Sequence, residues 1–353
     1  MINIYLSDYN LLSSVQSSFT ITQVDGWVDV AIRLDSQNIY MTRLYPYNGT
    51  ATFYGFQEIL RESMKARGLI CAQLTVDAME EMGMSSYEDK YIIYNEVQEI
   101  NDERDWLWQK FLTIRSFYTI PRQGGFLPLA FFSDATEQQV LTAECVFQED
   151  DGTIRTYPYT QTLYHYNLPR IYYVYIYLSS MIYKVEQAEG GPVGKLLSFT
   201  CHVGLRSMTV YVIDEPAEID FNFRNSFNVL EHIYIYGATK LKTSFDRKEA
   251  TSQGRTSFYN MSAERKHEVE TLPMDMEEAE WFNEFLASPY VERELNQDWC
   301  PNVLISDISS EISDSAKDLI KMKFSWRYED NARYIDSDRY PQMFSAPFTD
   351  SFK

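Results

Sequence analysis

Three glutamates in one helix-like segment, Glu277, Glu278 and Glu280, are the residues whose spacing first suggests chemistry. Carboxylates grouped in this way can act as general acids or bases. Asp275, however, stands where a helix N-cap is expected, and Glu278 follows three residues later, as in a capping box. We therefore assign Glu278 to helix initiation, and Glu277 and Glu280 to the solvent face near the positive end of the helix dipole.

A second acidic run, 306–315 (SDISSEISDS), could hold calcium through Asp307, Glu311 and Asp314. It lacks the glycine and the strict odd-position ligand spacing of known calcium loops, so a solvated turn is the preferred interpretation. The histidines are far apart and form no HxH, HxxxH or HExxH motif, which favours ordinary strand histidines over a zinc site. The four are His165, His202, His232 and His267.

Motifs for nucleophilic catalysis or nucleotide binding do not occur: there is no GxSxG, Walker or GxGxxG sequence. With 51 acidic residues, coincidental carboxylate pairs are unavoidable, so a glycoside hydrolase stays a remote alternative. The cysteines show no CxxC pair, which favours buried, reduced thiols. They are Cys71, Cys145, Cys201 and Cys300. The sequence thus predicts no catalytic, cofactor-binding or metal-binding residue, and a protein that is not an enzyme.

Charge and composition restrict the partners. The formal net charge of −20 in 353 residues argues against nucleic acid, whose binding needs a basic surface. The N-terminus has neither the basic region nor the apolar region of a secretory signal. The most apolar stretch, 171–185, is too short and too rich in tyrosine to cross a membrane. We expect synthesis in a cytoplasm and no membrane insertion.

The elements that would position any site are mostly strands. Hydrophobic periodicity predicts about fifteen short strands and two helices. One helix covers 56–67 and ends at Gly68. The other covers 275–287, after two separate strands within 254–272 and a break at Pro273. The stretch 171–183 is predicted as one strand, and 79–89 as a turn. Asp-Gly pairs at Asp25-Gly26 and Asp151-Gly152 predict hairpins.

This pattern predicts a mainly β protein with two or more β-sandwich-like or barrel-like domains, each with a short helix attached. An acidic, proline-bearing turn at Glu215-Pro216 marks the domain boundary. The expected domains are an N-terminal β-rich domain at 1–216, a C-terminal β-sandwich-like domain with one helix at 217–328, and an extended arm at 329–353. Residues 79–119 either belong to the first core or are an insertion into it.

A tyrosine-rich region, 157–183, offers a choice between binding and packing. Exposed rings of Tyr172, Tyr173, Tyr175 and Tyr177 could bind a surface glycan or a protein partner. The alternative is a strand with tyrosines on both faces, half in the core and half at an interface. In a protein that assembles with copies of itself, these two interpretations nearly coincide.

The C-terminal third carries a resemblance to a known group. Its motifs are Phe258-Tyr259, the strand 267–272, the Glu-Glu-Ala-Glu-Trp helix at 277–281 and the closing Trp326-Arg327. This run resembles tail structural proteins (distal-tail or baseplate components) of phages and prophages of gut anaerobes. The DGWVDVAI and YPYNGTATFYGFQEIL runs near the N-terminus are similar more loosely, and 79–215 has no match.

The resemblance implies a structural role without catalytic residues. Such proteins are β-sandwich modules that assemble side by side into rings. The expected partners are copies of the chain itself and other tail proteins, and the expected location is the tail of a virion made in the host cytoplasm. The alternative is a β module that binds glycans or the host surface.

Overall fold

The computed structural model describes residues 2–6, 10–96, 100, 103–133, 138–163, 170–252, 255–293, 302–309 and 319–329. These residues are mainly β, as the sequence predicted, with several sheets and four α-helices in the described part. Contacts divide the chain into two compact units, one of residues 1–235 and 280–289, the other of 236–279 and 290–353. The division after residue 235 lies further along the chain than the boundary suggested at residue 216.

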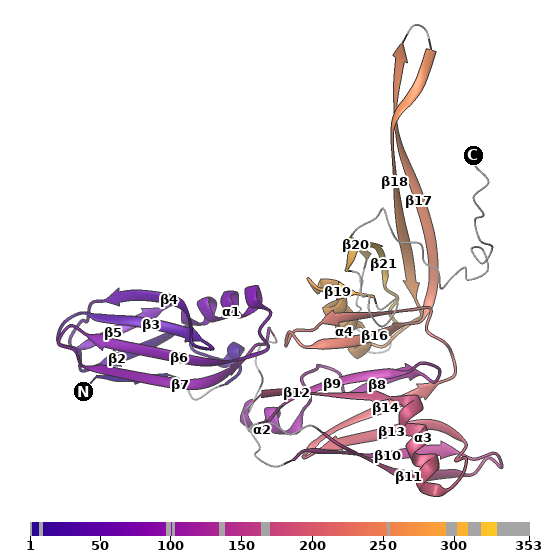
Figure 1. Cartoon of the computed structure of the whole chain (residues 1–353), viewed down its shortest axis with the longest axis horizontal. Coiled ribbons are helices and arrows are strands. Elements are labelled where there is room, and N and C mark those ends of the chain that lie inside the picture. Colours follow the sequence, from indigo (N-terminus) through magenta and orange to yellow (C-terminus); the bar gives the residue numbers. More distant parts are fainter. Residues whose placement is uncertain are drawn as a thin grey trace, which may run out of the picture. The chain divides into compact units, whose positions relative to one another are not determined.

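The N-terminal part of the first unit is a β-sandwich with one helix (Figure 1). A three-stranded sheet in the order β1-β2-β5 faces a four-stranded sheet in the order β4-β3-β6-β7. The elements are β1 (Asn3–Tyr5), η1 (Leu12–Ser14), β2 (Ser18–Thr22), β3 (Val28–Leu34), β4 (Gln37–Leu44), β5 (Thr50–Tyr54), α1 (Phe56–Arg67), β6 (Cys71–Glu80) and β7 (Ser85–Ile93). Alternate residues of both sheets and the apolar face of α1 bury one common core.

Helix α1 and its cap confirm the sequence prediction residue for residue. Phe56, Leu60 and Met64 are buried on one face. Gly68 adopts the left-handed conformation, φ 62°, and its N–H donates to the carbonyls of Lys65 and Met64. The alternation predicted for β3 is likewise present, since every second residue from Val28 to Leu34 is buried.

The predicted hairpin at Asp25-Gly26 is wrong. Strand β2 pairs with β1 and β5, whereas β3 pairs with β4 and β6, so this turn passes from one sheet of the sandwich to the other. The β3–β4 hairpin instead turns at Asp35 and Ser36, both with positive φ (50° and 67°). The predicted turn at 79–89 is also too long, because β6 and β7 occupy all of it except 81–84.

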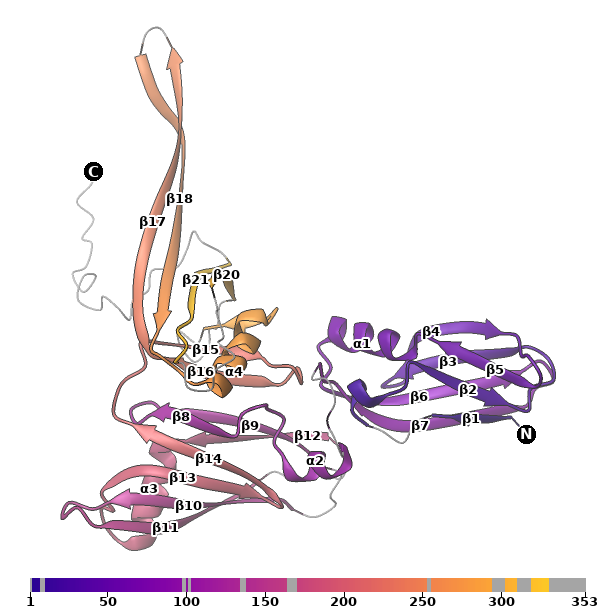
Figure 2. The same ribbon diagram turned by 180° about the vertical axis from the view of Figure 1, so that it is seen from behind.

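The remainder of the first unit holds a five-stranded sheet, a two-stranded sheet, the β15–β16 hairpin and two further helices (Figure 2). In the larger sheet the order is β11-β10-β13-β14-β8, and β8 runs parallel to β14. The elements are α2 (Glu103–Gln109), β8 (Phe117–Pro121), β9 (Phe126–Ser133), β10 (Val140–Gln148), β11 (Ile154–Thr162), β12 (Arg170–Tyr177), α3 (Leu178–Glu189), β13 (Lys195–Val203), β14 (Arg206–Ile213), β15 (Ile219–Arg224) and β16 (Leu230–Ile235). The Asp151-Gly152 hairpin is confirmed as the β10–β11 turn.

A strand predicted to span 171–183 is wrong in its second half. Strand β12 ends at Tyr177, and helix α3 follows at once. Leu178, Met181 and Val185 are buried at helical spacing, and Gly190 ends the helix with φ 77°. The aromatic segment at 106–111 begins in helix α2.

The second unit is built on a sheet in the order β17-β18-β21-β20. Its strands are β17 (Gly237–Ser252), β18 (Arg255–Thr271), β19 (Val291–Glu292), β20 (Val303–Ser309) and β21 (Lys323–Tyr328). Two separate strands within 254–272 were predicted, and this is wrong, since β18 is one strand of 17 residues. In both views the β17–β18 ribbon extends well beyond β20 and β21 (Figures 1 and 2). The arm predicted at 329–353 lies outside the described residues, apart from Glu329.

Helix α4 (Met276–Ala287) begins as predicted. The Asp275 carboxylate accepts a hydrogen bond of 2.8 Å from the Glu278 backbone N–H, which is N-cap geometry. The sequence predicted one apolar face of Met276, Ala279, Phe282, Phe285 and Leu286. The last four are buried, whereas Met276 at the start of the helix is 37% exposed.

Candidate interaction surfaces

The three described histidines are strand residues with structural contacts. His202 lies in β13, His232 in β16 and His267 in β18. The Nδ1 atom of His232 is 2.7 Å from the Asn222 side-chain oxygen, and its Nε2 is 3.3 Å from Asp220. The His267 ring stacks on Trp326 with centroids 4.0 Å apart. Among the described residues, no group of three or more His, Cys, Asp or Glu side chains could hold a metal ion. His165 lies outside these residues.

Cys71, Cys145 and Cys201 are free thiols. Burial raises the pKa of each to about 12, so at neutral pH they carry no thiolate nucleophile. Cys300 lies outside the described residues.

The acidic run considered for calcium is not a loop where the structure describes it. Asp307 lies in β20, and its carboxylate pairs with the Lys266 ammonium. The hydrogen bond from Lys266 lowers the pKa of Asp307 below its usual value. In the described part of this run, the Asp307 carboxylate is therefore paired with a lysine cation. Glu311 and Asp314 lie outside the described residues.

A buried carboxylate network holds helix α4 against the β15–β16 hairpin. Glu231 of β16 accepts hydrogen bonds from Trp281 Nε1 (2.6 Å), Tyr118 Oη (3.1 Å) and Asn225 Nδ2 (2.5 Å). Burial raises the pKa of Glu231, and the hydrogen bond from Trp281 partly opposes this. The Arg115 guanidinium lies 4.8 Å from the centroid of the Trp281 ring. Glu277, Glu278 and Glu280 are not members of this network.

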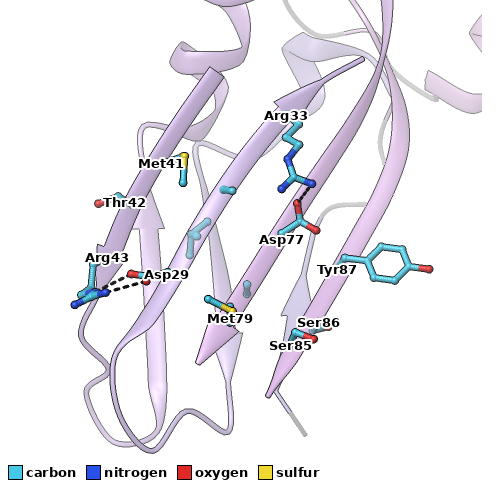
Figure 3. Close-up of a pocket in the computed structure, with 13 residues that line it drawn as sticks. Asp29, Arg33, Met41, Thr42, Arg43, Asp77, Met79, Ser85, Ser86 and Tyr87 are labelled. Carbon is cyan, nitrogen blue, oxygen red and sulfur yellow. Dashed lines mark hydrogen bonds and ion pairs between the residues drawn. The ribbon is translucent and has the colours of Figure 1, made fainter. Parts of the chain in front are cut away.

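The outer face of the four-stranded sheet is hollowed over about 650 Å³ (Figure 3). The strand register explains the hollow. Met41 of β4, Ala31 of β3, Asp77 of β6 and Tyr87 of β7 form one row across the sheet. The methyl group of Ala31 is the smallest side chain in the row, so its neighbours form walls around it.

Two ion pairs neutralise the charged side chains that line this hollow. Arg43 holds Asp29 with two hydrogen bonds of 2.7 and 2.9 Å, and this contact lowers the pKa of Asp29. Arg33 lies 2.6 Å from Asp77. The Tyr87 ring is 69% exposed and extends away from β7 (Figure 3). Tied ion pairs beside methionines and an exposed tyrosine suit contact with a protein surface.

The tyrosines of β12 divide between core and surface, as one of the two interpretations predicted. Tyr172 is buried, whereas Tyr175 and Tyr177 are exposed. On the exposed face Phe126 of β9 stacks on Tyr175, with centroids 5.9 Å apart, and lies 4.8 Å from Tyr177. Tyr173 continues the stack, 6.0 Å from Tyr175. Residues 164–169, which include further tyrosines, lie outside the described residues.

Among the described residues of the second unit, the β17–β18 hairpin carries the longest stretch of exposed side chains. Its two strands pair from Gly237–Thr271 to Ser252–Arg255, whereas β21 pairs with β18 only from His267 to Glu270. Side chains 241–249 are all exposed, on both faces of β17. The Arg247 guanidinium lies 5.5 Å from the Phe245 ring centroid and 5.4 Å from that of Phe258, so the three form one cluster near the tip.

The sequence did not predict the hollow, the carboxylate network or the length of the hairpin. One signal was available for the first of these: the 79–89 segment is acidic and rich in methionine, which is unusual for a plain turn. For the carboxylate network, no local pattern connects Glu231 to a tryptophan fifty residues later.

Comparisons with known proteins assign no family. Neither the family models nor the curated proteins give a match. Among solved structures, a bacterial ice-binding adhesin is similar at 11% identity over 77% of this chain and 92% of that chain, with a TM-score of 0.17. The plexin A4 extracellular region is similar at 7% identity over 95% of this chain and 40% of that chain, with a TM-score of 0.21. A Ca²⁺-stabilised adhesin of an Antarctic bacterium is similar at 10% identity over 77% of this chain and 69% of that chain, with a TM-score of 0.17. At such TM-scores the similarity carries no argument.

A search of the described helices finds none with the length and apolar character needed to cross a membrane.

Proposed function

We propose that this chain is a structural component of a phage tail tip or baseplate, and that it acts by binding copies of itself and other tail proteins. The main observation in support of the proposal is the long β17–β18 hairpin, whose side chains at 241–249 are exposed. Two-stranded ribbons are marginally stable in water by themselves. A ribbon of 16 residue pairs, with one register shift between Lys248 and Glu249, gains most from a partner that covers its faces.

Two further features support a role in assembly. The hollow face of the N-terminal sandwich combines neutralised charges with exposed methionine and tyrosine side chains, a composition suited to protein contacts. The resemblance of the 258–327 region to tail structural proteins supplies the class of particle. Assembly into a ring would place the protein in the virion tail after synthesis in the host cytoplasm.

Electron microscopy of the purified full chain tests the proposal. We expect closed rings in negative stain, and antibody label at the tail tip of particles from a host that carries the gene. A chain that stays monomeric at every concentration and binds no tail component would contradict it.

Glycan binding is the second candidate, and the exposed ring stack of Phe126, Tyr175 and Tyr177 favours it. Aromatic rings in a row can pack against the apolar faces of sugar rings. A glycan array separates the two candidates. Binding that Tyr175→Ala and Tyr177→Ala abolish would support a surface-binding module, whereas an array without signal would remove this candidate.

A further inference from the structure

Charge is distributed unevenly over this acidic chain, and the hairpin is one of its basic segments. Residues 237–271 contain seven Lys and Arg and five Asp and Glu side chains, a net charge of +2. Because the whole chain carries −20, the remaining residues carry −22. Two copies of such a chain repel each other unless oppositely charged surfaces meet.

The hairpin also presents apolar side chains. Phe245 and Phe258 are 56% and 57% exposed, and Arg247 lies between their rings. Leu241 is exposed on the same strand, and alternation places it on the face of Phe245. Lys242 is paired with Glu268, whereas neither Arg247 nor Lys248 forms a salt bridge with another described residue. Leu241, Phe245, Arg247 and Phe258 lie on one face of the hairpin, and Lys248 lies on the other face of β17, the edge strand of the sheet. We call these five residues the hairpin cluster.

A surface of opposite character lies on the N-terminal sandwich. The segment 79–89 contains four acidic residues and no lysine or arginine. Glu81, Glu88 and Asp89 are exposed, whereas Glu80 is buried and accepts a hydrogen bond from the Asp25 backbone N–H. Between the acids, Met79, Met82, Met84 and Tyr87 are exposed. We call these seven exposed residues of 79–89 the β6–β7 face. Met79 and Tyr87 also line the hollow of Figure 3, whereas Glu88 pairs with the buried Val76 and points to the other side of the edge strand β7.

We propose that the hairpin cluster of one copy docks on the β6–β7 face of a second copy of this chain. Phenylalanine rings would pack against the methionine thioethers, a favourable sulfur–aromatic contact. Arg247 and Lys248 would meet Glu81, Glu88 and Asp89 with complementary charge. Both surfaces belong to the same sequence, so the second copy needs no component that this chain does not supply.

The docking is heterologous, because the hairpin cluster and the β6–β7 face are different surfaces. A heterologous contact repeated around a rotation axis closes a ring. The inference rests on the proposed assembly function and names the two surfaces that carry it.

Charge-swapped variants of the full chain test this pairing. One variant carries Arg247→Glu and Lys248→Glu, and the other carries Glu81→Lys and Glu88→Lys. In sedimentation velocity at low salt, each variant alone is expected to self-associate at least about tenfold more weakly than the wild type. An equimolar mixture of the two is expected to recover association to within about threefold of the wild type, because each altered surface then meets its complement.

Controls separate folding from docking. Lys184→Glu changes one charge on the exposed side of helix α3, away from both surfaces in sequence, and should associate as the wild type does. Phe245→Ser with Phe258→Ser removes the rings and should weaken association without changing the circular dichroism of the remaining sheets.

The outcomes distinguish the two levels of the proposal. If the wild type associates and the mixture does not recover, this pairing is wrong while assembly still stands. If the wild type never associates, or binds only a different tail protein, homotypic assembly fails and the pairing fails with it. A compact state that is independent of concentration would show docking within one chain and would overturn the inference.

Discussion

Trp281→Phe tests whether the Glu231 network holds helix α4 in place. The replacement keeps an aromatic ring but removes the Nε1–H that donates to Glu231 at 2.6 Å. Glu231 is 3% exposed, so water does not replace the lost donor at low cost. Leaving this buried acceptor without its donor costs about 1–3 kcal/mol. The smaller ring also loses packing against Tyr118 and Phe223, which adds about 1 kcal/mol.

We therefore expect the free energy of unfolding of the first unit to fall by about 2–4 kcal/mol. Urea denaturation measures this loss, and hydrogen exchange of α4 and β16 amides assigns it to the first unit. The matched control is Trp27→Phe, which alters a half-buried tryptophan beside Arg43 on the N-terminal sandwich and should cost much less. In the double variant Trp281→Phe with Glu231→Gln, the two costs should not add, because both changes act on one hydrogen bond. A loss below about 0.5 kcal/mol for Trp281→Phe would refute the reasoning.

Three other predictions concern helix α4. Asp275→Ala removes the N-cap acceptor and should cost about 1 kcal/mol in thermal or urea unfolding, whereas Asp275→Asn should retain most of the stability; equal losses would contradict the capping role. Phe285→Ala opens a cavity beside Phe221 and should cost about 3–5 kcal/mol, and an unchanged unfolding midpoint would count against the packing. Burial raises the pKa of Glu284 to about 7, Ser226 lowers it in part, and Glu231 and Glu96 add to the rise. The contribution of Glu284 to the free energy of unfolding is therefore fully present below pH 4.5 and is lost as the pH rises through about 7. The loss is at most about 3 kcal/mol, and it is smaller than this because the side chain is only half-buried. Glu284→Gln should flatten that slope in unfolding measured across this pH range, and an unchanged slope would assign the effect elsewhere.

Local sequence signals were sufficient to predict a helix or strand where that element carries residues that mark its beginning and its end. Helix α1 has apolar residues at helical spacing and a left-handed Gly68, so its bounds follow from the sequence. Helix α4 begins at a real N-cap, Asp275. In β3 buried and half-buried side chains alternate, which gives the period of two directly.

Helix α3 was missed because its start is not marked. Tyr177, its N-cap residue, makes no side-chain cap, and the preceding tyrosines and isoleucines favour strands. The aromatic pattern thus continues through the junction, and only the burial of Leu178, Met181 and Val185 reveals the helical period.

The long hairpin was divided into separate strands for a different reason. Hydrophobic periodicity reports one buried face, whereas the described side chains in the outer part of β18 are exposed: Arg255, Thr256, Phe258, Glu264 and Arg265. The Asp25-Gly26 turn misled because an Asp-Gly pair predicts a turn but not which sheet its strands join. The hollow over Ala31 depends on the register of the four strands β3, β4, β6 and β7, which are separated along the chain by turns or by a helix. No single segment of the sequence therefore encodes it.

The central claim is that the β17–β18 hairpin is an assembly element that a second copy covers. Hydrogen exchange of the full chain, measured from dilute to concentrated solution, tests it most directly. We predict that amides of the ribbon between residues 242 and 252 exchange rapidly when the chain is dilute and become protected as it associates, together with amides of β7. Association that leaves both segments unprotected, or a chain whose ribbon exchange is the same at every concentration, would contradict the claim.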